Sequence, residues 1–318
     1  MKVVVLDAAT LPLPLRRPTW TADWIEYRAV SSDEIVDAIG DATIAITNKV
    51  PLRRADLIRT PQLQFICVAA TGYDCVDVTA CRDLGITVSN VPGYSTQSVS
   101  EWVIASIFAL RRKLFEYGDL AWHHWAGSSS FCVHGSPMFD ISGATLGIVG
   151  RGAIGQATAR LAKAIGMQVL FAEHRGRAYT REDFYPFEEV LKHADVLTLH
   201  CPLEEATRDL IGERELALLK RDAMVINSGR GALVDIPKLL EALSAGQIGG
   251  AALDVLPSEP PELNDLILRC AHRNLILTPH ISWAAPSGAQ RLINDIEANL
   301  NAFRSSSPIH VVSGGQPG

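Results

Sequence analysis

Three side chains with complementary acid–base chemistry lie in the second half of the chain. Arg230, Glu259 and His280 each follow a short apolar run that is typical of a buried strand. Because ligands of open parallel sheets bind beyond the carboxyl ends of the strands, we expect these residues to gather at one edge of a sheet. A guanidinium can hold a carboxylate and a carbonyl oxygen, an imidazole can donate a proton, and a carboxylate can hold the imidazole. The set therefore suits the reduction of a 2-keto acid, although each residue alone is also compatible with an ordinary loop or surface position.

A glycine-rich turn at 150–155 indicates where a nucleotide would bind. It follows a predicted strand, Thr145–Val149, and precedes a predicted helix, Ala157–Ile165. A second predicted strand, Gln168–Ala172, then ends on Glu173. Strand, turn, helix, strand and acid in this order form a dinucleotide-binding unit, whereas glycines alone would also fit an ordinary structural turn.

Each glycine of this unit has a predicted role. Gly150 permits the tight turn, Gly152 allows a pyrophosphate to approach the backbone, and Gly155 allows the helix and the strand to pack closely. The N-terminus of the helix offers unpaired N–H groups and the positive end of a dipole to the phosphates.

The acid at the end of the second strand bears on the choice of nucleotide. Glu173 can accept hydrogen bonds from a ribose 2′-hydroxyl and would repel a 2′-phosphate, so we expect NAD. The neighbouring cations could instead bind a 2′-phosphate, which leaves NADP open; they are His174, Arg175 and Arg177.

The elements that must position these residues predict an α/β protein with two doubly wound, parallel-sheet, Rossmann-like domains. Short apolar runs alternate with helical patterns in the first hundred residues, with strands expected at Val3–Leu6, Thr43–Thr47, Gln64–Ala69 and Ile86–Val88 and helices at Ser31–Ile39, Arg54–Arg59 and Asp77–Leu84. After the nucleotide unit, further strands are expected at Val196–His200, Met224–Asn227, Ala251–Val255 and Leu275–Thr278.

Two long helices connect the domains. We expect a helix at Ser98–Leu114 to lead out of the first domain, and a helix at about Ser287–Phe303 to cross back onto it. The first domain is therefore expected to be discontinuous. Residues 1–98 and 286–318 would form the substrate domain, and residues 99–285 the dinucleotide-binding domain.

Composition excludes several classes of partner. The chain has 318 residues and a net charge of −6 without a basic run, which argues against nucleic acid as a main partner. No apolar run is long enough to span a bilayer, and the start of the chain lacks a signal-peptide pattern, so we expect a cytoplasmic protein without membrane contact. The six cysteines show no metal-site spacing, and the cluster Trp122-His-His-Trp125 lacks an accompanying acid, so no metal is expected.

Several motifs in order resemble the D-isomer-specific 2-hydroxyacid dehydrogenases, from Val3 to about Val312. They are Val68–Asp74, Asn90–Tyr94, Gly150–Gly155, His200–Leu203, Asn227–Gly231, Leu253–Val255, Ser258–Pro260 and Thr278–His280. Two further stretches, Phe171–Gly176 and His280–Ala284, are similar to the glycerate dehydrogenase, or hydroxypyruvate reductase, branch.

The resemblance implies NAD(P)-dependent reduction of a small 2-keto acid, of the hydroxypyruvate or glyoxylate type, to the D-2-hydroxy acid and the reverse oxidation. His280 would be the general acid, Glu259 would hold its ring, and Arg230 would bind the carboxylate and the carbonyl of the substrate. The substrate would also meet backbone N–H groups of Thr71 and Gly72. Trp283 either shapes the substrate pocket or only packs. Further residues implied at the cofactor are Thr96, Arg151, Gly152, Ala153, Ile154, Cys201, Ser228 and Asp254, the last on the nicotinamide carboxamide.

An irregular segment at Ala121–Met138 carries large apolar residues that it cannot easily bury itself: Trp122, Trp125, Phe131 and Met138. Such residues are enriched in interface cores, so we expect a homodimer built through this segment and the helix at Ser98–Leu114. A loop that folds back on its own domain is the alternative.

Two other functions are compatible with the fold. One is a nucleotide-sensing, corepressor-like binding protein, against which the presence of Arg230, Glu259 and His280 argues. The other is a formate- or phosphite-type dehydrogenase, which a closed pocket around Trp283 would favour.

Overall fold

The computed structural model describes residues 1–177, 179–270 and 272–312. The chain forms two units, one from Met1–Ser95 together with the segment from Trp283 onward, the other from Thr96–Ser282. These limits lie three residues before the expected ones, 98 and 285, because the helix that leaves the first unit already begins at Thr96.

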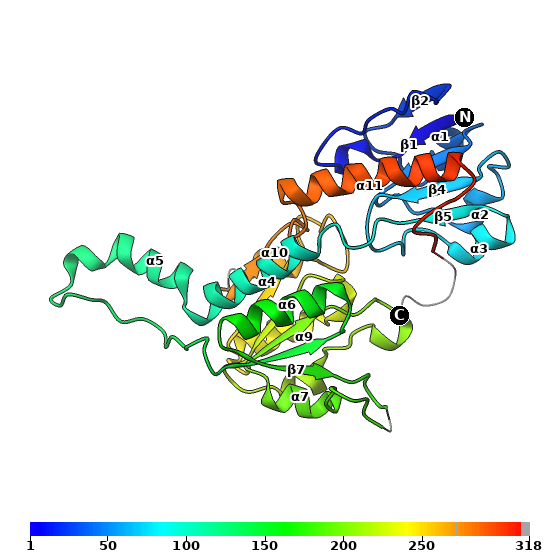
Figure 1. Cartoon of the computed structure of the whole chain (residues 1–318). Coiled ribbons are helices and arrows are strands. Elements are labelled where there is room, and N and C mark those ends of the chain that lie inside the picture. The colour runs from blue at the N-terminus through cyan, green and yellow to red at the C-terminus, as the bar shows by residue number, and fades with distance from the viewer. Residues whose placement is uncertain (178, 271, 313–318) are drawn as a thin grey trace. The chain divides into compact units, whose positions relative to one another are not determined.

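The first unit is built on a five-stranded parallel sheet with the strand order β2-β1-β3-β4-β5 (Figure 1). The strands are β1 (Lys2–Val5), β2 (Asp23–Glu26), β3 (Ile44–Thr47), β4 (Phe65–Val68) and β5 (Thr87–Ser89). The helices are α1 (Ile35–Ile39), α2 (Arg54–Leu57), α3 (Val78–Asp83) and α11 (Pro286–Arg304).

Helices cover both faces of this sheet. One buried cluster joins the sheet to α1, α2 and α3, and another joins its opposite face to α11 through Leu292, Ile296 and Leu300. The rings of Phe65 in β4 and Phe303 in α11 stack with their centroids 4.4 Å apart. The prediction that the C-terminal helix returns to a discontinuous first domain is therefore confirmed.

The second unit is built on a six-stranded parallel sheet with the order β11-β10-β9-β8-β6-β7. Its strands are β6 (Thr145–Val149), β7 (Gln168–Ala172), β8 (Val196–Leu199), β9 (Met224–Asn227), β10 (Gly250–Leu253) and β11 (Leu275–Leu277). Its helices are α4 (Thr96–Arg111), α5 (Leu114–His123), α6 (Ala153–Ala164), α7 (Phe187–His193), α8 (Glu213–Leu218), α9 (Ile236–Ser244) and α10 (Leu266–Arg269). Single 3-10 turns occur at Ala8–Thr10 in the first unit and at Trp125–Gly127, Glu205–Thr207 and Gly231–Leu233 in the second.

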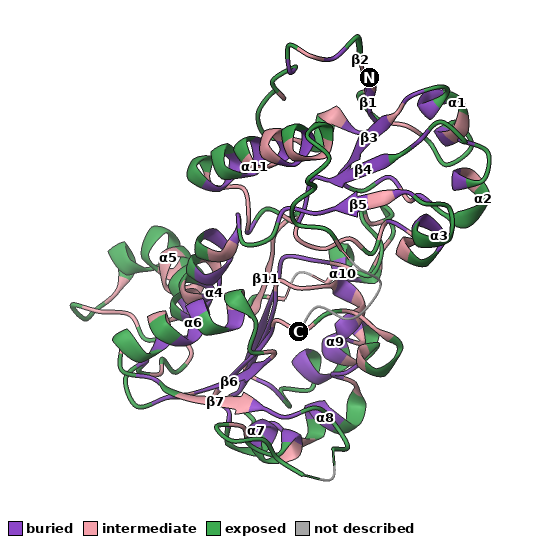
Figure 2. Cartoon of the chain, turned by 45° about the vertical axis from the view of Figure 1, so that its right-hand side comes forward, coloured by how far each residue is buried: buried purple, intermediate pink, exposed green. Residues whose placement is uncertain are grey.

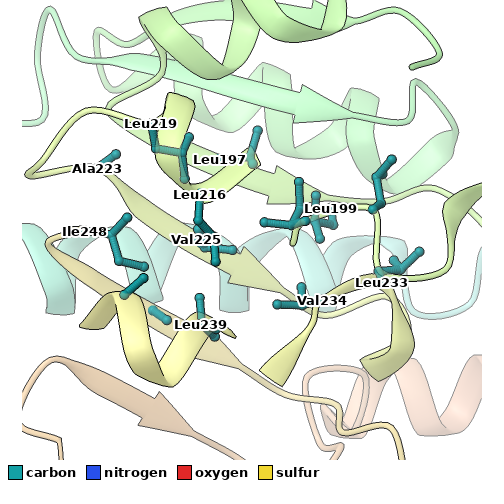
Figure 3. Close-up of a cluster of buried hydrophobic side chains, with 14 of the residues drawn as sticks. Leu197, Leu199, Leu216, Leu219, Ala223, Val225, Leu233, Val234, Leu239 and Ile248 are labelled. Atoms are coloured by element: carbon teal, nitrogen blue, oxygen red, sulfur yellow. The ribbon is translucent and has the colours of Figure 1, made fainter. Parts of the chain in front are cut away.

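This sheet also has a buried cluster on each face. Figure 3 shows one of them, where Leu197, Leu199 and Val225 on the strands meet the side chains of the covering helices. The central strands of both sheets are buried, whereas the edge strands β2, β7 and β11 are partly exposed, as are the outer faces of the helices (Figure 2). Both units are thus doubly wound parallel α/β structures, which confirms the predicted fold class.

The chain between α4 and β6 differs from the prediction. The helix expected at Ser98–Leu114 ends at Arg111, because Lys113 adopts a left-handed conformation with φ +50°. Its ammonium group reaches the side chain of Asn274 (3.1 Å). A separate helix, α5, follows and extends into the first three residues of the segment 121–138 that we expected to be irregular, and Figure 1 shows it projecting from the rest of its unit.

No described helix has both the length and the apolar character that a membrane crossing requires. Among the described residues there is also no group of three or more histidine, cysteine or acidic side chains that could hold a metal ion.

Candidate active site and dinucleotide site

The glycine-rich turn connects β6 to α6, and its three glycines have different surroundings. Gly150 has φ +99°, and a Cβ added to it would lie 2.6 Å from the carbonyl carbon of His200. A Cβ on Gly155 would lie 2.1 Å from the carbonyl oxygen of Gly150. The Cβ position of Gly152, the N-cap of α6, has no described atom within 4 Å. Two glycines are therefore needed for close packing, whereas Gly152 leaves open space at a helix N-terminus, where a pyrophosphate would fit.

The acid predicted at the end of the neighbouring strand is deeply buried. Glu173 follows Ala172, which pairs with Val149 at the end of β6, so the acid and the glycine-rich turn share one edge of the sheet. Its side chain is 2% exposed. Its carboxylate accepts hydrogen bonds from the backbone N–H of His174 (2.8 Å), from the backbone and guanidinium of Arg181 (2.9–3.1 Å) and from Arg177 (3.2 Å).

These contacts decide the charge of Glu173. Burial raises the pKa of this carboxyl, but hydrogen bonds from Arg181, His174 and Arg177 outweigh burial and leave the pKa well below its ordinary value. The group is therefore a carboxylate at neutral pH, and its oxygen atoms are already occupied.

A second link ties the loop after β7 to the glycine-rich turn. The guanidinium of Arg151 lies over the rings of Phe171 (5.1 Å) and Phe184 (5.4 Å) and donates a hydrogen bond to Asp183 (3.3 Å). The loop that carries Arg177 and the turn that would hold the pyrophosphate are thus neighbours. Arg181 and Asp183, which the sequence analysis did not single out, belong to this site.

The remaining predicted cofactor residues lie at the starts and ends of elements of the same unit. Thr96 is the first residue of α4 and is half-buried. Cys201 follows β8, and burial raises the pKa of its thiol to about 11. The hydroxyl of Ser228, directly after β9, is buried without a hydrogen-bond partner among the described residues. An orphaned buried hydroxyl at this edge fits a site that is completed by a ligand.

Arg230 is positioned by a turn that Asn227 holds together. The Asn227 side chain donates to the carbonyl oxygen of Arg230 (2.8 Å) and accepts from the N–H of Gly229 (3.0 Å). A Cβ on Gly231 would lie 1.9 Å from the carbonyl carbon of Leu256, so the turn after β9 packs directly against the segment after β10. That segment carries Glu259.

His280 and Glu259 contact each other directly. The distance between Nδ1 of His280 and Oε2 of Glu259 is 2.6 Å. The other carboxylate oxygen of Glu259 accepts from the backbone N–H of Leu256 (2.8 Å), which fixes the acid from the opposite side. The imidazole is 24% exposed, so its ring remains accessible. The structure thus brings the predicted imidazole and acid together at the carboxyl edge of β10 and β11.

Asp254 holds the loop that carries His280. Its side chain is 1% exposed and accepts hydrogen bonds from the hydroxyl of Thr278 (2.6 Å) and from the N–H groups of Ile281 and Ser282 (both 2.9 Å). His280 itself has φ +54°, and its N–H donates to the carbonyl oxygen of Asp254 (2.8 Å). The predicted contact of Asp254 with a nicotinamide carboxamide stays a prediction.

The predicted substrate loop of the first unit is held by hydrogen bonds to the residues that follow β5. Asn90 donates to the carbonyl oxygen of Thr71 (2.7 Å), and the Thr71 hydroxyl donates to the carbonyl oxygen of Val91 (2.9 Å). Thr71 and Gly72 follow β4 and are half-buried. Trp283 packs its ring edge-on against Tyr94, with centroids 6.1 Å apart, and joins the core under α11.

A buried acid that the sequence analysis passed over shapes the same edge. The carboxylate of Asp7, after β1, accepts from the backbone N–H groups of Asn48 (2.9 Å) and Lys49 (2.6 Å), after β3. The only signal for this role in the sequence was the position of Asp7 at the end of the first predicted strand.

Comparisons with known proteins agree with this geometry. The family model described as the NAD binding domain of D-isomer specific 2-hydroxyacid dehydrogenases matches residues 104–282. A putative 2-hydroxyacid dehydrogenase of Haemophilus influenzae is 43% identical over 95% of this chain and 98% of its own length. A glycerate dehydrogenase of Methylorubrum extorquens is 40% identical over 98% of both chains.

Among solved structures, an acyclic imino acid reductase in complex with NADPH and D-Arg is similar, with a TM-score of 0.84 and 27% identity over 98% of this chain and all of that one. Three observations indicate the same family: the parallel-sheet α/β unit with its glycine-rich turn, the predicted motifs and these relatives. The chain belongs to the D-isomer-specific 2-hydroxyacid dehydrogenase family and is an NAD(P)-dependent oxidoreductase that acts on 2-keto acids.

Proposed function

We propose that this enzyme reduces hydroxypyruvate and glyoxylate to the corresponding 2-hydroxy acids, with D-glycerate as the product from hydroxypyruvate, and catalyses the reverse oxidation. The contact of 2.6 Å between His280 and Glu259 carries the proposal, because it is the arrangement that a proton donor at a carbonyl needs. The glycerate dehydrogenase relative supports the choice of a small, hydroxylated keto acid.

In this mechanism His280 protonates the carbonyl oxygen. Nδ1 faces Glu259, and the opposite ring nitrogen, Nε2, would donate the proton to the substrate. Glu259 fixes the orientation of the ring and stabilises its charged form. NAD(P)H, when bound, would supply the hydride for the carbonyl carbon. In the reverse direction His280 accepts the hydroxyl proton.

Arg230 binds the substrate carboxylate and polarises the carbonyl. Its planar guanidinium suits two parallel hydrogen bonds, and the turn closed by Asn227 sets its backbone against the segment that carries Glu259. We also propose that backbone N–H groups of Thr71 and Gly72 bind the substrate carboxylate. We assign the dinucleotide to the second unit, Thr96–Ser282, which also carries Arg230, Glu259 and His280, and further substrate contacts to the first unit.

A substrate panel tests the proposal. Hydroxypyruvate, glyoxylate, pyruvate and phenylpyruvate are offered with NADH and with NADPH, and the chirality of the glycerate product is determined. We expect the highest kcat/KM with hydroxypyruvate or glyoxylate and the D-isomer as product. A clear preference for phenylpyruvate, or the L-isomer as product, would refute this assignment.

We further propose a homodimer that pairs through α4, α5 and the segment up to Met138. Large apolar side chains there are exposed in the single chain, with Trp122 at 87% and Phe131 at 89%. Exposed aromatic residues on α5 and on the segment that follows it indicate a protein interface, and two-fold homodimers are the commonest protein oligomers.

Sedimentation velocity at micromolar concentration tests the dimer. The wild-type chain is expected at twice the mass of one chain, and the double variant Trp122→Ser, Phe131→Ser at the mass of one. Ile58→Ser, which removes an apolar side chain that is 58% exposed on the first unit, is the matched control and should leave the dimer intact. A wild-type monomer would contradict the proposal.

We also propose that the protein works in the cytoplasm without nucleic-acid or membrane partners. All six cysteines are free thiols, which suits a reducing compartment. Cell fractionation tests the location, and recovery with the membrane fraction would contradict it.

A further inference from the structure

Glu173, which in the sequence indicated NAD, has a different role in the structure. An acid at the end of β7 discriminates against a 2′-phosphate only when its charge faces the ribose. The carboxylate of Glu173 is 2% exposed, and its oxygen atoms accept five hydrogen bonds from His174, Arg177 and Arg181. Glu173 therefore acts as an anchor for arginines.

The two anchored arginines carry more positive charge than the single carboxylate of Glu173 can neutralise. One carboxylate holds two guanidinium groups, so the three side chains of Glu173, Arg177 and Arg181 together carry one net positive charge. The side chains of Arg177 and Arg181 are 31% and 41% exposed, so both can also meet a ligand from solvent. The guanidinium of Arg177 also lies over the ring of Tyr179, 4.5 Å from its centroid, and that of Arg181 lies over the ring of Phe184, 4.0 Å from its centroid.

The position of this pair fits the ribose end of a dinucleotide. Glu173 and Gly150 follow paired residues of neighbouring strands, and the bond from Arg151 to Asp183 ties the arginine loop to the glycine-rich turn. A dinucleotide whose pyrophosphate lies at the N-terminus of α6 would place its adenosine ribose toward the end of β7. The pair is thus where a 2′-phosphate would arrive.

The other cation of the loop is directed elsewhere. Arg175 donates to the carbonyl oxygen of Ala206 (3.3 Å) and lies 3.6 Å from Glu215 in α8. It offers a matched control within the same loop, because it has the same charge but a different set of partners.

We propose that Arg177 and Arg181, held in place by Glu173, form a binding site for the 2′-phosphate of NADPH, so that the chain binds NADPH more tightly than NADH. A guanidinium pair suits a phosphate dianion, since the N–H groups that do not bind Glu173 or Tyr179 can donate hydrogen bonds to its oxygen atoms. The proposal rests on the dinucleotide site described above but not on the identity of the keto acid.

Calorimetric titration with two adenosine nucleotides tests the site without turnover. Adenosine 2′,5′-bisphosphate and 5′-AMP differ only in the 2′-phosphate. We expect the wild-type protein to bind the bisphosphate at least ~10-fold more tightly, as two charge-assisted hydrogen-bonding groups would give. Arg177→Ala should lose most of this difference while it keeps the affinity for 5′-AMP, since Arg181 still neutralises Glu173.

Arg175→Ala is the control and should bind both nucleotides as the wild type does. Arg181→Ala removes the second arginine, and its folding is checked by circular dichroism. Equal affinities of the wild-type protein for the two nucleotides would overturn the proposal, as would an Arg177→Ala variant with an unchanged preference. If hydroxypyruvate is nevertheless reduced with NADH, the proposed function stands and only the 2′-phosphate site fails.

Discussion

Nδ1 of His280 lies 2.6 Å from Oε2 of Glu259, at the edge where β10 and β11 end. The pair is held from both sides, since Leu256 donates to the other oxygen of Glu259 and Asp254 holds the His280 loop. The reactivity of the imidazole therefore depends on an acid whose own position is fixed by backbone groups.

The first prediction concerns this acid. Glu259→Gln keeps the size of the side chain but removes the charge that stabilises a protonated imidazole, so kcat with hydroxypyruvate should fall by roughly 10- to 100-fold. The affinity for the nucleotide, measured by fluorescence titration, should not change. Glu262→Gln, an exposed acid in the same loop, is the control. Unchanged turnover in Glu259→Gln would show that the contact has no catalytic role.

The second prediction concerns the buried anchor of the loop. Asp254→Asn replaces an acceptor with an amide donor that faces the N–H of Ser282, and it should lower the free energy of unfolding in urea by about 2 kcal/mol. Turnover should fall as well, because the backbone of His280 is no longer fixed. A variant as stable and as active as the wild type would contradict the role assigned to Asp254.

The glycine-rich turn gives a matched pair of variants. Gly155→Ala would place a methyl group 2.1 Å from the carbonyl oxygen of Gly150, so its midpoint of thermal unfolding should fall by several degrees. Gly152→Ala meets no described atom within 4 Å and should fold normally, yet bind either nucleotide at least ~10-fold more weakly because the methyl group occupies phosphate space. The reverse pattern would mean that the turn does not receive the pyrophosphate.

His200 predicts a dependence of stability on pH. Desolvation lowers the pKa of its imidazole to about 4 from the ordinary 6.5, so the unfolded chain binds the proton more readily than the folded one between these values. Its contribution to stability is complete above pH 6.5 and is lost as the pH falls toward 4. Between pH 7 and pH 4.5 the free energy of unfolding of the wild type should fall by on the order of 2 kcal/mol more than that of His200→Asn, as measured by urea unfolding. Identical losses in both proteins would contradict this origin.

The sequence predicted the parts of the site that local patterns encode. Buried strands are short apolar runs, and the spacing of Gly150, Gly152 and Gly155 reflects steric requirements that a backbone must meet within a few residues. It missed β2, since Asp23-Trp-Ile-Glu26 is an edge strand with exposed ends and no apolar run. It also missed the break at Lys113, whose left-handed backbone accompanies a contact with Asn274, far away in the sequence.

The meaning of Glu173 also required the structure. An acid at this position predicts NAD when its oxygen atoms face the ribose, but its orientation depends on Arg181, which a folded-back loop brings to it. Asp254 is a similar case, because its partners Thr278 and Ser282 belong to the neighbouring strand end. Sequence patterns predict which residue types follow a strand, whereas the role of each residue depends on side-chain partners from other segments of the chain.

The most direct test of the central claim is the rate of reduced-nicotinamide oxidation with hydroxypyruvate, measured for the wild-type enzyme and for His280→Ala at equal nucleotide saturation. If His280 protonates the carbonyl, the variant should bind NADPH and NADH with wild-type affinity and lose at least ~100-fold in kcat. Turnover close to that of the wild type in His280→Ala would contradict the account.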